Sequence, residues 1–118
     1  MPRFESLEAW QQAHKLALGV YALSRDLPED EKFGLTSQLR RAAVSAAANI
    51  AEGRERESDA DFSHFLTIAA GSAAEVQYYL ILGRDLGYWT DAEVKGISNL
   101  AAEVIQVIRA LRDSLHRA

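Results

Sequence analysis

The apolar side chains of this sequence recur at intervals of alternately three and four residues, which is the period of an α-helix. The pattern is unbroken in the third of four such segments, which carries Phe62, Leu66, Ala69, Ala73, Val76, Leu80 and Gly83. No segment alternates polar and apolar positions with period two over a useful length, so a sheet is not expected. The periodicity predicts four helices, over about residues 6–26, 35–56, 59–86 and 91–115.

Residues that begin and end helices fall between these segments. Ser58 followed by Asp61 resembles a capping box with a shorter acid, and Thr90 followed by Glu93 fits the standard pattern at a helix N-terminus. Gly87 stands where the C-terminus of a helix needs a left-handed residue. Because the second and third connections are short, neighbouring helices are expected to run antiparallel. The sequence therefore predicts an all-α protein with one domain, residues 1–118, folded as an antiparallel up-down-up-down four-helix bundle.

The apolar surface of two segments exceeds what the core of one bundle needs. The first segment carries two adjacent apolar rows, and the third adds, beside its main row, Phe65, Ile68, Tyr79, Leu82 and Leu86. A core-facing helix of a monomer usually needs a single apolar stripe. We therefore expect a homo-oligomer. The alternative is a monomer with an enlarged core and some exposed aromatic side chains.

The composition is that of a globular chain, with 118 residues of which 48% are hydrophobic and 25% are charged. The absence of cysteine excludes disulfides and thiolate metal sites. No uncharged stretch approaches the roughly 20 residues that cross a bilayer, so we expect a cytoplasmic protein without a membrane partner. Thirteen basic and seventeen acidic residues give a net charge of −4. This balance argues against coating nucleic acid by bulk positive charge and leaves room for a local basic face.

A more specific signal begins at Phe33. Residues 33–45 read FGLTSQLRRAAVS, residues 49–53 read NIAEG, and Gly71-Ser72 and Glu75 follow. These motifs resemble the four-helix-bundle proteins encoded within intervening sequences of bacterial 23S ribosomal RNA genes, a family related to the accessory proteins of diversity-generating retroelements. The resemblance covers almost the whole chain. It implies a bundle that assembles as a homopentamer and associates with ribosomal RNA or with a nucleic-acid-handling protein.

Arginines on the second and fourth segments are the candidate nucleic-acid contacts. Guanidinium groups can bind phosphates through two parallel hydrogen bonds. Adjacent residues of a helix diverge by about 100°, so the neighbours Arg40 and Arg41 cannot both perform this role. The candidate contacts are Arg40, Arg54, Arg56, Arg109 and Arg112, with Arg117 beyond them at the end of the fourth segment.

A second group of polar residues, Arg41, Asn49 and Glu75, is expected to form a structural cluster. Glu75 falls on the second apolar row of its helix, where a partly buried carboxylate needs a partner. Arg41 or Asn49 is the expected partner. Asn49 lies in an alanine-rich stretch and could instead fix the register of two helices by hydrogen bonding.

Motifs for catalysis and cofactor binding are missing from the sequence. There is no glycine-rich phosphate loop, no GxSxG and no HExxH. Asp61-x-x-His64 supplies only half of a carboxylate-bridged di-iron site, which needs the Glu-x-x-His motif twice and two further glutamates. We therefore expect no enzymatic activity, no cofactor and no metal. The expected function is association with RNA, and the alternative is a scaffold that binds proteins and no nucleic acid.

Overall fold

The computed structural model describes residues 3–116, and in that range it contains four long helices and no strand. Helix α1 spans Glu8–Ser24, α2 spans Leu35–Arg54, α3 spans Asp59–Asp85 and α4 spans Asp91–Ser114. Two short 3-10 helices, η1 (Arg3–Ser6) and η2 (Glu29–Glu31), precede α1 and α2. The all-helical prediction is confirmed, and the predicted ranges differ from the observed helices by no more than two residues at either end.

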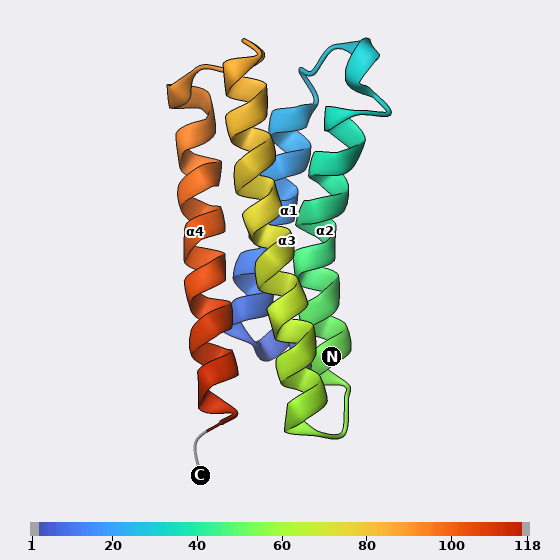
Figure 1. The fold of residues 1–118 in the computed structure, drawn as a ribbon, viewed down its shortest axis with the longest axis vertical. Helices are drawn as coiled ribbons and strands as arrows, with labels where there is room; N and C mark the ends of the chain where they lie inside the picture. Colours follow the sequence, from blue (N-terminus) through green and yellow to red (C-terminus); the bar gives the residue numbers. More distant parts are fainter. Residues whose placement is uncertain (1–2, 117–118) are drawn as a thin grey trace.

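The four helices lie side by side along one long axis (Figure 1), in a body of 48 × 22 × 22 Å. The connection from α1 to α2 and the connection from α3 to α4 lie at one end of the body, which we call the η2 end (Figure 1). The connection from α2 to α3 lies at the opposite end, which we call the α3-start end (Figure 1). Each helix packs on the next one in the sequence, and α1 also packs on α4.

Each helix turns one apolar stripe toward the interior of the bundle. The row predicted on α3, from Phe62 to Gly83, is buried along its whole length. On α2 the inward positions include several alanines, whose small side chains allow the close packing of α2 on α3. The largest fully buried side chains come from all four helices: Leu16, Val20, Leu39, Ile50, Leu66, Val76, Leu80, Val104 and Ile108.

The predicted helix ends are confirmed in atomic detail. The Ser58 hydroxyl accepts a hydrogen bond from the backbone N–H of Asp61 at 3.1 Å, which caps α3. At the start of α4, the Thr90 hydroxyl accepts from the N–H of Glu93 at 3.2 Å, and the Glu93 carboxylate accepts from the N–H of Thr90 at 3.0 Å. Gly87 has a φ of 86°, the left-handed conformation expected after α3.

Glu31 joins the two connections at the η2 end. Its carboxylate accepts hydrogen bonds from the backbone N–H of Leu35 at 3.1 Å and from the Tyr88 hydroxyl at 2.8 Å. Both bonds favour the charged carboxylate and lower the pKa of Glu31 from its usual 4.5. A carboxylate with a lowered pKa stabilises the fold fully above its unfolded-state pKa. This contribution is therefore present at neutral pH and is lost as the pH falls through the lowered pKa of Glu31.

Helix α3 carries more apolar surface than the core uses. By length and composition alone it could cross a membrane, since an 18-residue stretch has a mean hydropathy of 1.3. A core helix of a soluble bundle passes the same test, and the inner stripe of α3 does pack on its neighbouring helices. Only 33% of that stretch is buried within the chain, however, and Ile68, Tyr78 and Ile81 are exposed. The outer face of α3 is therefore an apolar surface that the single chain does not cover.

Candidate nucleic-acid interface

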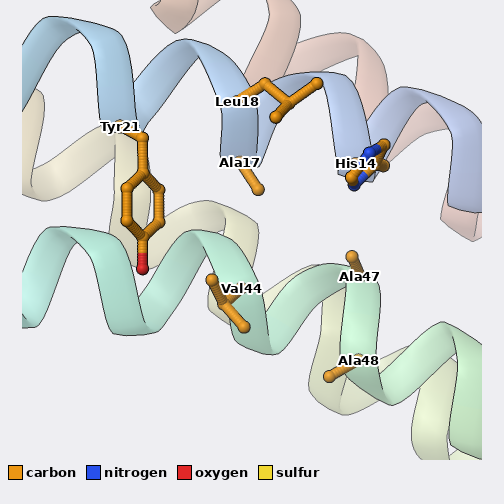
Figure 2. Close-up of a pocket in the computed structure, with 7 residues that line it drawn as sticks. All are labelled: His14, Ala17, Leu18, Tyr21, Val44, Ala47 and Ala48. Atoms are coloured by element: carbon orange, nitrogen blue, oxygen red, sulfur yellow. The ribbon is translucent and has the colours of Figure 1, made fainter.

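An apolar groove runs along the seam between α1 and α2 (Figure 2). It has a volume of about 430 Å³ and is lined by His14, Ala17, Leu18 and Tyr21 from α1 and by Val44, Ala47 and Ala48 from α2. Nearly the whole lining is apolar, and one of its members, Leu18, is 59% exposed to solvent. His14 is stacked on the indole of Trp10, with ring centres 4.9 Å apart. We call this hollow the apolar groove.

A second groove continues the same seam toward the η2 end. It has a volume of about 540 Å³ and is lined by Tyr21, Lys32, Phe33, Thr36, Ser37, Arg40, Arg41 and Val44. Tyr21 and Val44 line both grooves, so the two hollows meet at these residues. Three lining side chains are cationic and none is acidic, and we call this hollow the basic groove.

Arg40 is held in a fixed position at the edge of the basic groove. Its Nε donates a hydrogen bond to the Ser24 hydroxyl at 2.8 Å, and its guanidinium lies 4.7 Å from the centre of the Tyr21 ring. Because Nε takes up one of the five N–H donors of the side chain, the terminal nitrogens remain for another acceptor. The structure thus gives Arg40 a partner on α1, and it leaves Arg41 exposed on the neighbouring position of α2. The expectation that these neighbours cannot serve the same site is corrected, because both long side chains line the basic groove.

Phe33 and Lys32 lie at the mouth of the basic groove, just before α2 begins. The Phe33 side chain is 88% exposed, and it is the most exposed large hydrophobic residue of the described chain. The ammonium of Lys32 lies 5.6 Å from the centre of the Phe33 ring. An aromatic face and a positive charge therefore stand side by side in solvent.

The candidates Arg54 and Arg56 lie at the far end of α2. Arg54 follows Arg40 by 14 residues, which corresponds to about 21 Å along a helix. Arg56 pairs with Glu52 at 2.7 Å, and its guanidinium lies 4.7 Å from the centre of the Phe65 ring. The neighbouring carboxylate neutralises much of the positive charge of Arg56, and Arg54 is half-buried.

The remaining candidates lie on α4, near the α3-start end. Arg109 is exposed and makes none of the hydrogen bonds or ion pairs found among residues 3–116. Arg112 is half-buried and contacts the Thr67 hydroxyl at 3.4 Å and the Asp113 carboxylate at 3.9 Å. Arg117 lies outside the described residues. The structure therefore separates the candidate arginines into two groups at opposite ends of the bundle.

The structure does not bring the expected cluster of Arg41, Asn49 and Glu75 together. Glu75 is exposed, and within the described range it makes no hydrogen bond or ion pair with either expected partner. It stands one residue before the buried Val76, and a rotation of about 100° places it outside the core stripe of α3. The expectation of a partly buried carboxylate at this position is thus corrected for the single chain.

Asn49 has partners of a different kind. Its side-chain nitrogen donates to the backbone carbonyl of Ser45 at 2.8 Å and to the Ser45 hydroxyl at 3.0 Å. The Ser45 hydroxyl is also hydrogen-bonded to the Ser72 hydroxyl of α3, at 2.9 Å. A short polar chain therefore crosses from α2 to α3 beside the alanine-lined contact. Such a chain favours one register of the two helices, the alternative role that the sequence suggests for Asn49.

Sequence reasoning names Phe33 only as the first residue of the family motif, and it makes neither Lys32 nor Phe33 a candidate contact. Both lie in the longest predicted connection, outside every helical row, where periodicity carries no information. A signal is nevertheless present, since a large aromatic residue next to a lysine in a polar connection has no place in the predicted core. The roles of Ser24 and Tyr21 as partners of Arg40 depend on how α1 and α2 are rotated, which the sequence does not specify.

Comparison with known proteins finds a matching family and similar solved structures. The family described as 23S rRNA-intervening sequence protein matches residues 5–110. A solved structure from Bacteroides thetaiotaomicron, described as a protein of unknown function from the S23 ribosomal protein family, is similar with a TM-score of 0.82 and 28% sequence identity. That match covers 88% of this chain and 97% of the other. No curated protein matches the sequence.

Proposed function

Because the chain belongs to the 23S rRNA-intervening sequence protein family, we propose that it is a non-enzymatic, up-down-up-down four-helix-bundle protein that associates with itself and with RNA. The proposed RNA is ribosomal RNA or the RNA of a nucleoprotein complex. The basic groove is the observation that carries this proposal. Lys32, Arg40 and Arg41 line one hollow of the surface, and no acidic residue shares the lining.

The charge distribution favours this groove over the arginines at the other end of the bundle. Arg56 and Arg112 each lie next to a carboxylate that offsets their charge. With a net charge of −4 the whole chain repels phosphates at long range, so binding depends on a local excess of cations. Arginine and lysine side chains supply most of the contacts between proteins and phosphate groups, which gives the groove its chemical fit to RNA.

A salt titration of binding to structured ribosomal RNA tests the proposal. Each phosphate contact releases counterions, so the logarithm of the affinity should fall linearly with the logarithm of the salt concentration. We expect Arg41→Ala, an exposed change in the basic groove, to reduce the slope by about one unit. Arg109→Ala is the matched control, because Arg109 is an exposed arginine at the other end of the bundle.

The result can contradict the proposal in two ways. A reduced slope for Arg109→Ala with an unchanged slope for Arg41→Ala would move the RNA interface to the α3-start end. No binding at about 50 mM salt, where phosphate contacts are strong, would remove RNA as the partner. The alternative function, a scaffold that binds proteins, would then stand, supported by Tyr78, Ile81 and Leu86, which are exposed apolar residues of the α3 region.

Self-association is supported by the apolar groove and by the outer face of α3. If the subunit number is five, as the resemblance implies, light scattering should give about 65 kDa, five times the 13.0 kDa of one chain.

Leu18→Glu places a charge in the apolar groove and is expected to release folded single chains, because an unpaired charge is costly to bury at an interface. Gln106→Glu adds the same charge on the exposed side of α4 and should leave the mass unchanged. A wild-type mass of 13 kDa at micromolar concentration would contradict self-association.

A further inference from the structure

We infer that the basic groove binds an unpaired nucleotide, with its base stacked on the ring of Phe33 and its flanking phosphate held by Lys32, Arg40 and Arg41. This inference rests on the proposed association with RNA and makes it more specific. It assigns the protein to the single-stranded parts of an RNA, such as loops and bulges, in preference to continuous duplex. Sequence-tolerant binding of single strands commonly combines these two elements, an aromatic platform and a cationic groove.

The exposure of Phe33 is the first step of the argument. A phenylalanine side chain that remains 88% exposed gains none of the stabilisation that burial would give it. Phe33 contributes nothing to the core, whose cluster of buried residues does not include it. Its ring lies instead at a groove with three cationic side chains, and every nucleobase has a flat face that can stack on such a ring.

The backbone that carries Phe33 is held on both sides. The N–H of Lys32 donates to the carbonyl of Glu29 at 3.0 Å, and the N–H of Gly34 donates to the carbonyl of Glu31 at 3.0 Å. The Glu31 side chain fixes the start of α2 through Leu35 and bonds to Tyr88 across the η2 end. The backbone that presents the ring is therefore ordered before a base stacks on it, and only the side chain has to be fixed on binding.

The cations stand where they can reach the phosphate of a stacked nucleotide. Lys32 already lies beside the Phe33 ring, and Arg40 is fixed by Ser24 and Tyr21 with its terminal nitrogens available. The preceding residues Glu29, Asp30 and Glu31 are acidic, but none of them lines the groove, and the Glu31 carboxylate is bonded to Leu35 and Tyr88. Thr36 and Ser37 also line the hollow and bring hydroxyl groups that can bond to base edges or to a ribose.

A groove of about 540 Å³ is also of suitable size. Sites for small ligands range over roughly 300–1,000 Å³, and a nucleotide falls within the ligands that such sites accept. The apolar groove next to it has almost no polar lining and contains no arginine or lysine. The charge of the basic groove, and not its volume, therefore selects a nucleic-acid strand as the occupant.

The test compares two oligonucleotides of equal length and charge, a single-stranded RNA of about ten nucleotides and its abasic counterpart. Fluorescence anisotropy of labelled strands gives both affinities. We expect Phe33→Ala to weaken binding of the base-containing strand about tenfold, the loss of one base–aromatic stack, and to leave the abasic strand and the salt slope unchanged. Arg41→Ala should weaken the binding of both strands and reduce the salt dependence of their affinities. Gln106→Ala changes an exposed residue of α4 that lines neither groove and should change neither affinity.

The outcomes separate this inference from the proposed function. If wild type binds RNA with a salt-dependent affinity and Phe33→Ala binds both strands as wild type does, stacking is refuted and the RNA function stands. If wild type binds neither strand nor structured RNA, both fail. If Phe33→Ala changes the mass measured by light scattering and not the affinity, Phe33 packs against a second copy and the inference is wrong. A deoxyribose version of the strand shows whether the groove distinguishes RNA from DNA.

Discussion

Leu66→Ala is expected to lower the free energy of unfolding by about 3–4 kcal/mol, because it removes a fully buried side chain and leaves a cavity in a close-packed core. Leu66 lies near the start of the buried stripe of α3, the helix that packs on both α2 and α4. The loss should appear as a lower midpoint of urea denaturation followed by circular dichroism, at a fixed protein concentration.

Leu86→Ala provides the matched control for this experiment. It is the same substitution in a leucine that is more than half exposed, directly after α3 ends. We expect a change within about 0.5 kcal/mol, as for most surface substitutions. Equal losses for the two variants would mean that the stripe containing Leu66 is not the core of the protein in solution.

Gly83→Ala is expected to destabilise the fold by about 2 kcal/mol, although alanine is normally the better helix former. Helix α3 passes so close to Trp89 that a Cβ at Gly83 would lie 2.6 Å from Cε3 of the indole. Trp89 is buried and packed in the core, so it cannot turn aside without opening a gap. The midpoint of chemical denaturation measures the loss.

The same substitution at Gly71 should have the opposite sign. Gly71 lies in the same helix, and a Cβ there would meet nothing within 4 Å. The higher helix propensity of alanine is then expected to raise the free energy of unfolding by about 0.5–1 kcal/mol. If Gly71→Ala destabilises the protein as much as Gly83→Ala, a second subunit must pack closely on the outer face of α3.

The sequence predicts α3 and the start of α4 well because two independent signals agree at these boundaries. The apolar rows define the helical segments, and Ser58, Thr90 and Gly87 mark their ends with side-chain or backbone chemistry that acts locally. Local interactions of this kind do not depend on how the helices are arranged. The observed helices therefore begin and end within two residues of the predicted ranges.

The candidate site is harder to predict, because it depends on the rotation of each helix about its own axis. Two neighbouring apolar rows on α3 differ by a rotation that the period alone does not resolve. Glu75 lies on the second row, which is only partly buried, and its own side chain is exposed. Arg40 meets Ser24 and Tyr21 of α1 and not a residue of α3 for the same reason. Phe33 belongs to no helical row, so only its position in the folded chain shows that it borders a groove.

The order in which the helices touch one another has a consequence for how quickly the chain folds. Three of the four large helix contacts join neighbours in the sequence, and only the packing of α1 on α4 brings distant parts together. Folding rates rise as the mean sequence separation between contacting residues falls, and helical bundles reach times of milliseconds or less. The most extensive contact, α2 on α3, joins helices with a connection of only four residues between them, Glu55 to Ser58. The α2–α3 hairpin closes the shortest loop and forms the most extensive helix contact, which favours it as the folding nucleus. The packing of α1 on α4 is then the late step.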